Sequence, residues 1–267
     1  MRKITLTNHD YYVPRTWDEM TKAQLLELAK ITRTCKTTIE IQLKFFLHCV
    51  NGRVMSNVAN AIYILMIGRQ KHVLFLDEIN ALTGAFDWLF EINEGGQPVL
   101  APKLTTNHFK ELRCGLHLLH GPNNALDDIT YNQFIWLQTY HNFLDARAPQ
   151  YLDELINTIY ATKSGSHHTK NVRRLPQDVK TVILWFYLGT LDFLSLIFPQ
   201  VLSGGSGNDG EEINVFDNQQ RIIDSLAEGD VTKKDQVRNS LLYDALYSMQ
   251  MAAIRMEEME KQQSKHK

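Results

Sequence analysis

Hydrophobic positions along the chain recur mostly at helical spacing, and one run is apolar nearly all the way round. This run extends from Val182 to Leu202, so a helix there has no water-facing side and must lie under other helices or in a membrane. A membrane span needs about 20 apolar residues, and Asp192 near the middle would be costly in lipid. Pro199 ends or kinks the helix. The pattern therefore favours a buried central helix over a membrane span.

Helix-start signals predict where several other helices begin. Thr16-x-x-Glu19 and Thr21-x-x-Gln24 both fit the capping box, in which a hydroxyl and a carboxyl or amide satisfy free amides of the first turn. We expect a short turn at Trp17–Met20 and a helix from about Lys22 to Thr32. Further apolar runs assigned to the helical core lie at Thr37–Val50, Val58–Ile67, Val73–Phe90 and Phe109–Leu119.

The second half of the chain repeats this pattern. Asp127 or Asp128 is expected to cap a helix that extends from Thr130 to about Ala146. Later helices are predicted from Pro149 to Tyr160, from Asn218 to Leu226 and, after Thr232-x-x-Asp235, to about Lys261. Beyond Met256 the last helix turns polar and is expected to project or fray.

Three stretches lack helical spacing. Ile4 to Val13 alternates loosely and predicts a short strand or an extended arm, and Gly95-Gly96 fits a small hairpin. Lys163 to Leu175 is polar and basic, which indicates an exposed loop. Ser203 to Glu212 is rich in glycine and serine, which is typical of a flexible loop.

Together these patterns predict an all-α fold: a single globular helical domain of about nine helices around the buried central helix, with one small β-hairpin left open. We expect an N-terminal arm at residues 1–15, a helical core at 16–202, a flexible loop at 203–212, and C-terminal helices at 213–267 with a projecting last helix.

Composition narrows the class of protein. The hydrophobic fraction is 44 %, the charged fraction 22 % and the net charge −2, which is ordinary for a globular protein and gives no global bias toward nucleic acid or membrane surfaces. Three widely spaced cysteines favour a reducing compartment, and the first residues lack the apolar core of a signal peptide. Cytoplasmic synthesis without export is the expectation.

Three residues raise the possibility of a metal site. Cys114, His117 and His120 are three residues apart, which would place them on one face of the predicted helix, and thiolate with imidazole suits zinc. No CxxC or HExxH accompanies them, so polar, half-buried positions of an amphipathic helix are the preferred interpretation.

Other chemical motifs are weaker still. Gly205 to Gly210 matches GxGxxG by letter, but an apolar helix precedes it and acids follow, so a linker is favoured. The basic cluster around His167-His168 could touch phosphates, although it lacks interleaved aromatics; its cations are Lys163, Lys170, Arg173 and Arg174. Asp192 could be a functional carboxylate, but a hydrogen-bonded or core-edge group is more common. No catalytic motif is recognisable, which lowers the expectation of an enzyme.

Two blocks of sequence support a family resemblance. The first begins Val13-Pro-Arg-Thr-Trp-Asp-Glu-Met, and the second begins His120-Gly-Pro-Asn-Asn-Ala-Leu-Asp-Asp and is followed by Tyr151-Leu-Asp-Glu-Leu. With Leu175 to Pro199, they resemble a poorly characterised family encoded in phages and prophages of Bacteroidetes, among the virion and tail genes. The family often has a basic residue after its Ile-Tyr pair, whereas Ala161 follows here. The resemblance carries over no functional residue.

The resemblance implies a non-enzymatic phage virion component or tail/baseplate assembly factor, a late protein or assembly chaperone that acts through protein–protein contacts. Its partners would be other phage structural or tail proteins, with a homo-oligomer left open and neither nucleic acid, membrane nor cofactor expected. It would be located in the host cytoplasm during assembly, and a place in the mature virion is left open. Two alternatives remain: a membrane-associated protein that uses residues 182–202, and a small metal-binding protein. The predicted partner-binding residues are Tyr11, Tyr12, Met249, Met251, Met256 and Met259.

Overall fold

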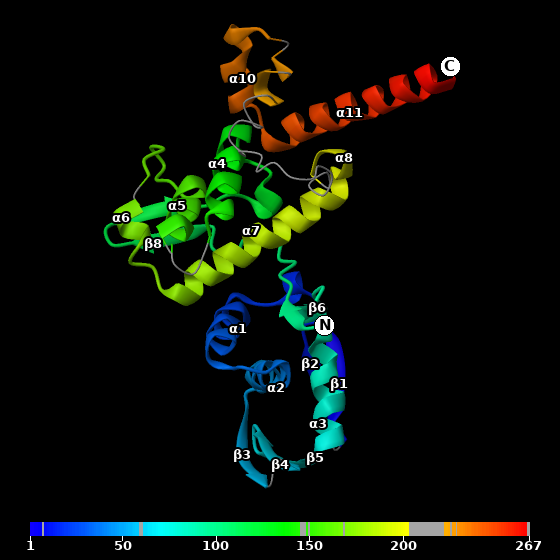
Figure 1. Cartoon of the computed structure of the whole chain (residues 1–267). Helices are drawn as coiled ribbons and strands as arrows, with labels where there is room; N and C mark the ends of the chain where they lie inside the picture. The colour runs from blue at the N-terminus through cyan, green and yellow to red at the C-terminus, as the bar shows by residue number, and fades with distance from the viewer. Residues whose placement is uncertain are drawn as a thin grey trace. The chain divides into compact units, whose positions relative to one another are not determined.

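The chain folds into two compact units, each built from two stretches of sequence. Unit 1 consists of Met1–His108 and Pro176–Gly189, and unit 2 of Phe109–Leu175 and Thr190–Lys267. The computed structural model describes residues 1–6, 8–58, 61–144, 148, 150–167, 169–202, 222–224, 226–227 and 229–265 (Figure 1). The predicted flexible loop at 203–212, and most of the predicted helix at 218–226, lie outside these residues.

Unit 1 is a mixed α/β unit. Its described residues form three small antiparallel sheets, with strand orders β1-β2, β3-β4-β5 and β6-β7. The strands are β1 (Arg2–Leu6), β2 (His9–Val13), β3 (Gly52–Val58), β4 (Ile62–Ile67), β5 (Gln70–Phe75), β6 (Phe90–Ile92) and β7 (Pro98–Leu100). The helical elements are α1 (Lys22–Thr34), α2 (Thr38–Cys49), α3 (Leu76–Thr83), the first part of α7 (Gln177–Ile197), and 3-10 turns at Trp17–Glu19 and Gly84–Leu89.

The first two long helices begin where the sequence predicts. The Thr21 hydroxyl accepts a hydrogen bond from the backbone N–H of Gln24 at 3.3 Å, and Gln24 Oε1 accepts one from the backbone N–H of Thr21 at 2.8 Å. This reciprocal pair is the capping box. Before α2, the Thr37 hydroxyl accepts from the backbone N–H of Glu40 at 3.3 Å. The predicted capping box is confirmed at Thr21. The one predicted at Thr16 is wrong, because Thr16 precedes the 3-10 turn at Trp17–Glu19 without a side-chain cap hydrogen bond.

The core of unit 1 joins its two stretches of sequence through aromatic packing. The indole of Trp17 is buried between Trp88 and Trp185, with ring centroids 6.1 and 5.3 Å away. On α7, Gly189 lies so close to the backbone of Leu104 that a Cβ at this position would be 2.2 Å from the Leu104 nitrogen. Only glycine permits this approach of the helix to the chain.

The apolar run assigned to a helix at Val58–Ile67 instead contributes the middle of a three-stranded antiparallel sheet. β4 pairs with β3 on one side and with β5 on the other. A two-residue turn, Gly68-Arg69, joins β4 to β5, and Gly68 has a φ of +58°. A two-residue hairpin turn favours glycine at such a position, and β-branched residues favour strands. The helical prediction is therefore wrong here.

The predicted helix at Val73–Phe90 is only partly helical, because its first three residues end β5 and α3 begins at Leu76. The hairpin predicted around Gly95-Gly96 is confirmed as β6 and β7. The N-terminal residues form a second hairpin, β1 and β2, with Leu6 paired to His9.

Unit 2 is mainly helical and has one two-stranded sheet among its described residues. Its strands are β8 (Glu111–Cys114) and β9 (His117–His120). Its helices are α4 (Tyr131–Asn142), α5 (Gln150–Ile159), α6 (Thr169–Val172), the end of α7, α8 (Pro199–Leu202), α10 (Lys234–Asn239) and α11 (Leu242–Lys265), with 3-10 turns at Asn124–Leu126 and Val231–Lys233.

Two predicted segments of unit 2 differ in detail. The N-cap of α4 is Thr130 rather than Asp127 or Asp128, since the Thr130 hydroxyl and the Gln133 side chain form a capping box. The basic stretch predicted as a loop contains the short helix α6.

The segment predicted as a helix at Phe109–Leu119 is the β8–β9 hairpin. Cys114 and His117 are paired across the two-residue turn Gly115-Leu116, and Gly115 has a φ of +65°. As at the β4–β5 turn, the glycine permits a left-handed backbone that reverses the chain.

The single last helix predicted from Thr232 is broken into α10 and α11. The carbonyl of Ser240 accepts a hydrogen bond from the backbone N–H of Tyr131 at 2.9 Å, and the N–H of Leu242 donates to the carbonyl of Ile129 at 2.9 Å. These bonds to the chain before α4 hold the backbone extended at the break, so the helix cannot continue through it.

The predicted central helix exists as α7, but it is not buried throughout. Its side chains from Val182 to Thr190 are mostly buried, whereas Asp192 is exposed and Leu196 is 75 % exposed. The apolar stretch therefore does have a water-facing part, and the prediction of a fully enclosed helix is wrong for its last turns.

The all-α prediction is wrong as a whole. The described residues contain nine strands in four small antiparallel sheets in addition to the helices, so the fold class is mixed α/β. Two kinds of strand were missed: strands with apolar residues on both faces, and strands joined to their neighbour by a two-residue turn.

Candidate protein-binding surface

The three-stranded sheet of unit 1 has one face that packs on the unit and one that does not. Directly opposed residues of antiparallel strands lie on the same face, and successive residues alternate between faces. On β4 and β5 one set is mostly buried: Leu65, Ile67, His72 and Leu74 are buried, Tyr63 is half-buried, and Gln70 beside the turn is exposed. The alternate set defines what we term the outer face: Arg53, Ser56, Val58, Ile62, Ile64, Met66, Lys71, Val73 and Phe75.

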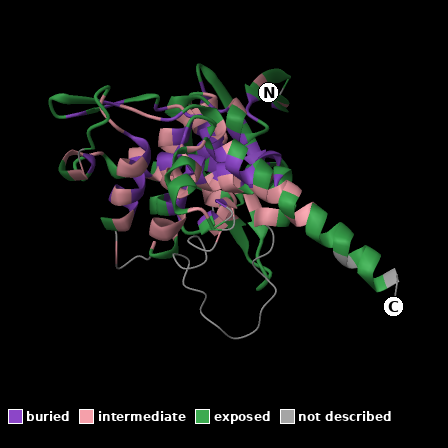
Figure 2. Ribbon diagram, turned by 90° about the horizontal axis from the view of Figure 1, so that it is seen from above, coloured by how far each residue is buried: buried purple, intermediate pink, exposed green. Residues whose placement is uncertain are grey.

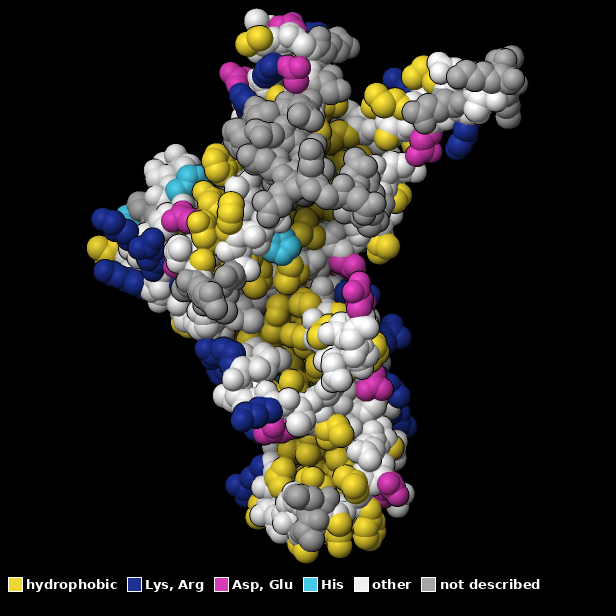
Figure 3. Space-filling model, in the orientation of Figure 1, with side chains coloured by type: hydrophobic (Ala, Val, Ile, Leu, Met, Phe, Trp, Pro, Cys, Tyr) yellow, Lys and Arg dark blue, Asp and Glu magenta, His cyan; other side chains and the backbone are white. Residues whose placement is uncertain are grey.

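The outer face is apolar at its centre and at one end. Val58, Val73 and Phe75 are 51 %, 51 % and 59 % exposed, and Ile62 and Ile64 beside them are half-buried. Because these residues occupy adjacent positions on three paired strands, they form one continuous patch. Hydrophobic side chains gather over the end of unit 1 that contains β3, β4 and β5 (Figure 3). A contiguous exposed apolar patch of this kind is typical of an interaction site.

β3 is one of the two edge strands of this sheet, with β5 on the other side, and is exposed on both faces. Every residue from Arg53 to Val58 is exposed, including Val54 and Met55. Soluble proteins usually blunt such edges with proline, lysine or a bulge. β3 has a register shift between Val54 and Ser56, but it contains no proline and a single charged residue. The edge therefore adds apolar contact area beside the outer face.

Opposite charges mark the two ends of the outer face. Arg53 and Lys71 flank Met66 in the row nearest the β4–β5 turn, and Arg69 lies in that turn. At the other end, Asp77 comes two residues after Phe75, in the first turn of α3. Among the residues that the structure describes, none of these four charged groups has an ion-pair partner.

The acid next to Asp77 has a structural role. Glu78 accepts a hydrogen bond from the backbone N–H of Phe75 at 2.8 Å, so it satisfies a free amide at the start of α3. Both acids are exposed and favour the positive end of the helix. The acidic end of the outer face is thus part of a stable helix start.

The predicted tyrosines lie on β2, and only one is open to solvent. Tyr12 is 60 % exposed. The Tyr11 hydroxyl lies 3.0 Å from Nε2 of His72 and 3.3 Å from Oε1 of Gln70, so Tyr11 connects β2 to β5. Partial burial raises the pKa of Tyr11. Sequence reasoning found this strand but not the outer face on β3 to β5.

The predicted methionines of the last helix fall into two groups. Met249 and Met251 are half-buried on the part of α11 that packs on α8, whereas Met256 and Met259 are more than half exposed. Figure 2 shows the exposed second half of α11, as predicted for the polar end of this helix. The methionines on α11 belong to unit 2, and the tyrosines on β2 belong to unit 1.

The metal hypothesis depended on a helix that does not form. His117 and His120 are three residues apart on β9, so the strand directs them to opposite faces. Cys114 is buried, and His120 Nδ1 lies 3.6 Å from Glu111 Oε1 across the hairpin. Within the described part of the chain, no group of three His, Cys, Asp or Glu residues could hold a metal ion.

The remaining candidate motifs gain no support. The GxGxxG-like segment at 205–210 and His168 lie outside the described residues. Lys163, Lys170 and Arg174 are exposed, and Arg173 Nε lies 3.9 Å from Asp153 Oδ2. Asp192 is exposed rather than buried, so the idea of a functional carboxylate in an apolar setting is wrong.

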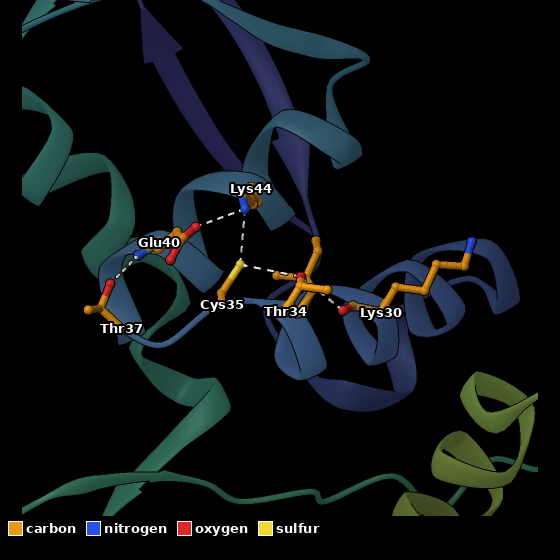
Figure 4. A network of polar contacts seen from close by, with 7 residues as sticks. Lys30, Thr34, Cys35, Thr37, Glu40 and Lys44 are labelled. Carbon is orange, nitrogen blue, oxygen red and sulfur yellow. Dashed lines mark hydrogen bonds and ion pairs between the residues drawn. The ribbon is translucent and has the colours of Figure 1, made fainter.

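A polar cluster that the sequence gave no reason to expect joins α1 to α2 (Figure 4). Lys44 Nζ donates to Glu40 Oε1 at 2.8 Å and to Cys35 Sγ at 3.2 Å, and the Thr34 hydroxyl lies 3.8 Å from the same sulfur. The hydrogen bond from Lys44 lowers the pKa of Glu40. At the other end of α2, burial raises the pKa of the Cys49 thiol to about 12. These contacts fix a helix junction, and we assign the cluster a structural role.

Within the described residues, one helix is long and apolar enough to cross a membrane by length and composition, namely α7, and half of its most apolar window is buried in the protein. The core helix of a soluble protein passes the same test. Because Trp185 on this helix packs against Trp17 in the core of unit 1, its first part is already covered by protein.

The fold and surface define a mixed α/β protein with two compact units and an exposed apolar sheet face. No family model, curated protein or solved structure matches the chain. Phage and tail roles therefore gain no support from known proteins.

Proposed function

We propose that this protein is a non-enzymatic binding protein that acts through contact between the outer face of β3, β4 and β5 and another protein surface. The observation that carries the proposal is the exposure of Val58, Val73 and Phe75, each more than half open to solvent in one continuous patch. Burying such side chains is the main favourable contribution to protein association.

The surroundings of the patch also support a protein partner. Protein interfaces commonly combine an apolar centre with a polar or charged rim. The outer face has this arrangement, with Arg53 and Lys71 in its last row and Asp77 beyond its opposite end. The paired strands hold the patch on regular secondary structure, which presents a preformed surface to a partner.

Site-specific photo-crosslinking in cells that express the full chain tests the proposal. A photoreactive residue in place of Val73 should yield a discrete protein adduct, because the outer face is covered in the bound state. The matched control is the same residue in place of Lys30, an exposed position on α1 away from the sheet. Absence of any adduct at Val73, or equal adducts at both positions, would overturn the proposed function.

A further inference from the structure

We infer that the outer face is occupied by a second copy of this chain, so that two outer faces pack against each other across a two-fold axis. This inference rests on the proposed function, because it names the partner of the same surface. It follows from the order of apolar and charged residues along the strands.

The rows of the outer face provide an apolar centre that can pack against its own copy. One row contains Ile64 and Val73, and the next contains Val58, Ile62 and Phe75. Two sheets that pack face to face lie about 10 Å apart and interdigitate side chains of this size. In an isologous pair the same apolar patch meets itself, so each copy covers the exposed side chains of the other.

The charges select one of the two ways to place the axis. An axis parallel to the strands would set Arg53 and Lys71 against their own copies and bring like charges together. An axis in the plane of the interface and perpendicular to the strands reverses the strand direction between copies. The basic row of each copy then faces Asp77 of the other, so opposite charges meet at both ends.

A partner of uniform charge fits this surface less well. An acidic partner would pair with Arg53 and Lys71 but would face the like charge of Asp77, and a basic partner would have the opposite conflict. The surface carries one basic and one acidic end, and a reversed copy of the chain presents the same two ends in the opposite order. The complementarity therefore points to the second copy.

The first test measures the mass of the purified full chain by light scattering over a concentration series. We expect a concentration-dependent dimer. Phe75→Ser should weaken dimerisation by about tenfold or more, since it removes a buried aromatic contact. Serine is a good helix N-cap, which suits the role of position 75 before α3. Ile92→Ser is the matched control, because Ile92 is 70 % exposed in unit 1 but lies on β6, outside the outer face.

The second test is a charge swap. Lys71→Glu alone and Asp77→Lys alone should each weaken the dimer about tenfold, because each creates two like-charge contacts per dimer. The double variant Lys71→Glu with Asp77→Lys should restore it, since the two exchanged charges meet again in the isologous arrangement. Circular dichroism of each variant verifies that the fold is retained.

Three outcomes would overturn the inference. These are a wild-type chain that remains a monomer at every concentration, a dimer that Phe75→Ser leaves intact, and single charge variants that the double variant does not rescue. If the chain is a monomer while the Val73 crosslinker still captures a different protein, the second-copy inference fails and the proposed function stands. If neither a dimer nor an adduct is found, both fail.

Discussion

His72 is a titratable residue on the buried face of the same sheet whose other face is exposed. Its ring lies under β2, with Nε2 3.0 Å from the Tyr11 hydroxyl and its centroid 6.2 Å from that of His9. Burial lowers the pKa of His72, and the nearby His9 lowers it further. The folded protein therefore holds this imidazole neutral at pH values where the unfolded chain would protonate it.

This difference predicts acid sensitivity. Between the ordinary histidine pKa of about 6.5 and the lower folded pKa of His72, the unfolded state binds more protons, so the free energy of unfolding falls as the pH falls. The slope contributed by one fully shifted histidine is about 1.4 kcal/mol per pH unit. Urea unfolding at pH 7.5 and 5.5 should show this loss, and His72→Gln should reduce it.

The comparison has an internal control. Between pH 7.5 and 8.5 the His72 imidazole is neutral in both states, so the wild type and His72→Gln should have equal slopes there. Equal slopes below pH 6.5 as well would show that His72 does not contribute. His108 and His141, whose pKa values burial also lowers, would then be the source of any remaining acid sensitivity.

Among the elements, α7 closely approaches another segment of backbone at Gly189. Gly189→Ala would place a methyl group 2.2 Å from the backbone nitrogen of Leu104 and 2.6 Å from its carbonyl oxygen. Backbone cannot move aside as a flexible side chain can. We therefore expect the free energy of unfolding to fall by about 3 kcal/mol, at the upper end for overpacking.

Gly84→Ala is the matched control for this substitution. Gly84 has right-handed helical backbone angles, and an added Cβ would lie 3.6 Å from Asp87 Oδ2, an ordinary contact. Its effect should be neutral, or stabilising by about 0.5 kcal/mol. Thermal or denaturant unfolding of both variants measures the difference, and equal stabilities would contradict the close approach of α7.

Capping residues made the helices of unit 1 predictable. The strands of the three-stranded sheet could not be recognised, because the central strand β4 is apolar on both faces. Thr21 and Gln24 mark the start of α1 in the sequence as in the structure. In β4, however, Ile62 and Ile64 on the outer face alternate with Tyr63 and Leu65 on the inner face, so no polar period of two remains. A strand that is apolar on both faces cannot be told from a buried helix by periodicity alone.

The candidate surface escaped prediction for the same reason. Residues such as Val73 and Phe75 were assigned to a helix in the core because nothing in the sequence marks them as exposed. The turn at Gly68-Arg69 was the available signal, since a two-residue turn that begins with glycine indicates a hairpin. The same signal, Gly115-Leu116, was available for β8 and β9.

At the scale of the whole molecule, unit 1 depends on residues far along the chain. Pro176–Gly189 supplies Val182, Trp185 and Phe186 to its buried side chains. Without these residues, Trp17 in Met1–His108 would lose its contact with Trp185. The unit is therefore complete only when the chain has been made to residue 189.

A fragment of residues 1–108 should consequently fail to fold. We expect it to lack the cooperative urea transition of the full chain and to expose Trp17 to solvent, seen as a red-shifted tryptophan emission. Loss of several fully buried large side chains removes more free energy than the stability of a typical domain. A cooperative transition in this fragment would contradict the assignment of 176–189 to unit 1.

The passage of the chain between units also constrains how its gene can change. The chain crosses from one unit to the other after His108, after Leu175 and, within α7, after Gly189. A single exchange of coding sequence between two diverged copies of the gene would therefore separate parts of one hydrophobic core wherever it fell between residues 108 and 190. The two units can be inherited intact only together, and substitutions in Pro176–Gly189 must remain compatible with packing partners encoded far upstream, within residues 1–108.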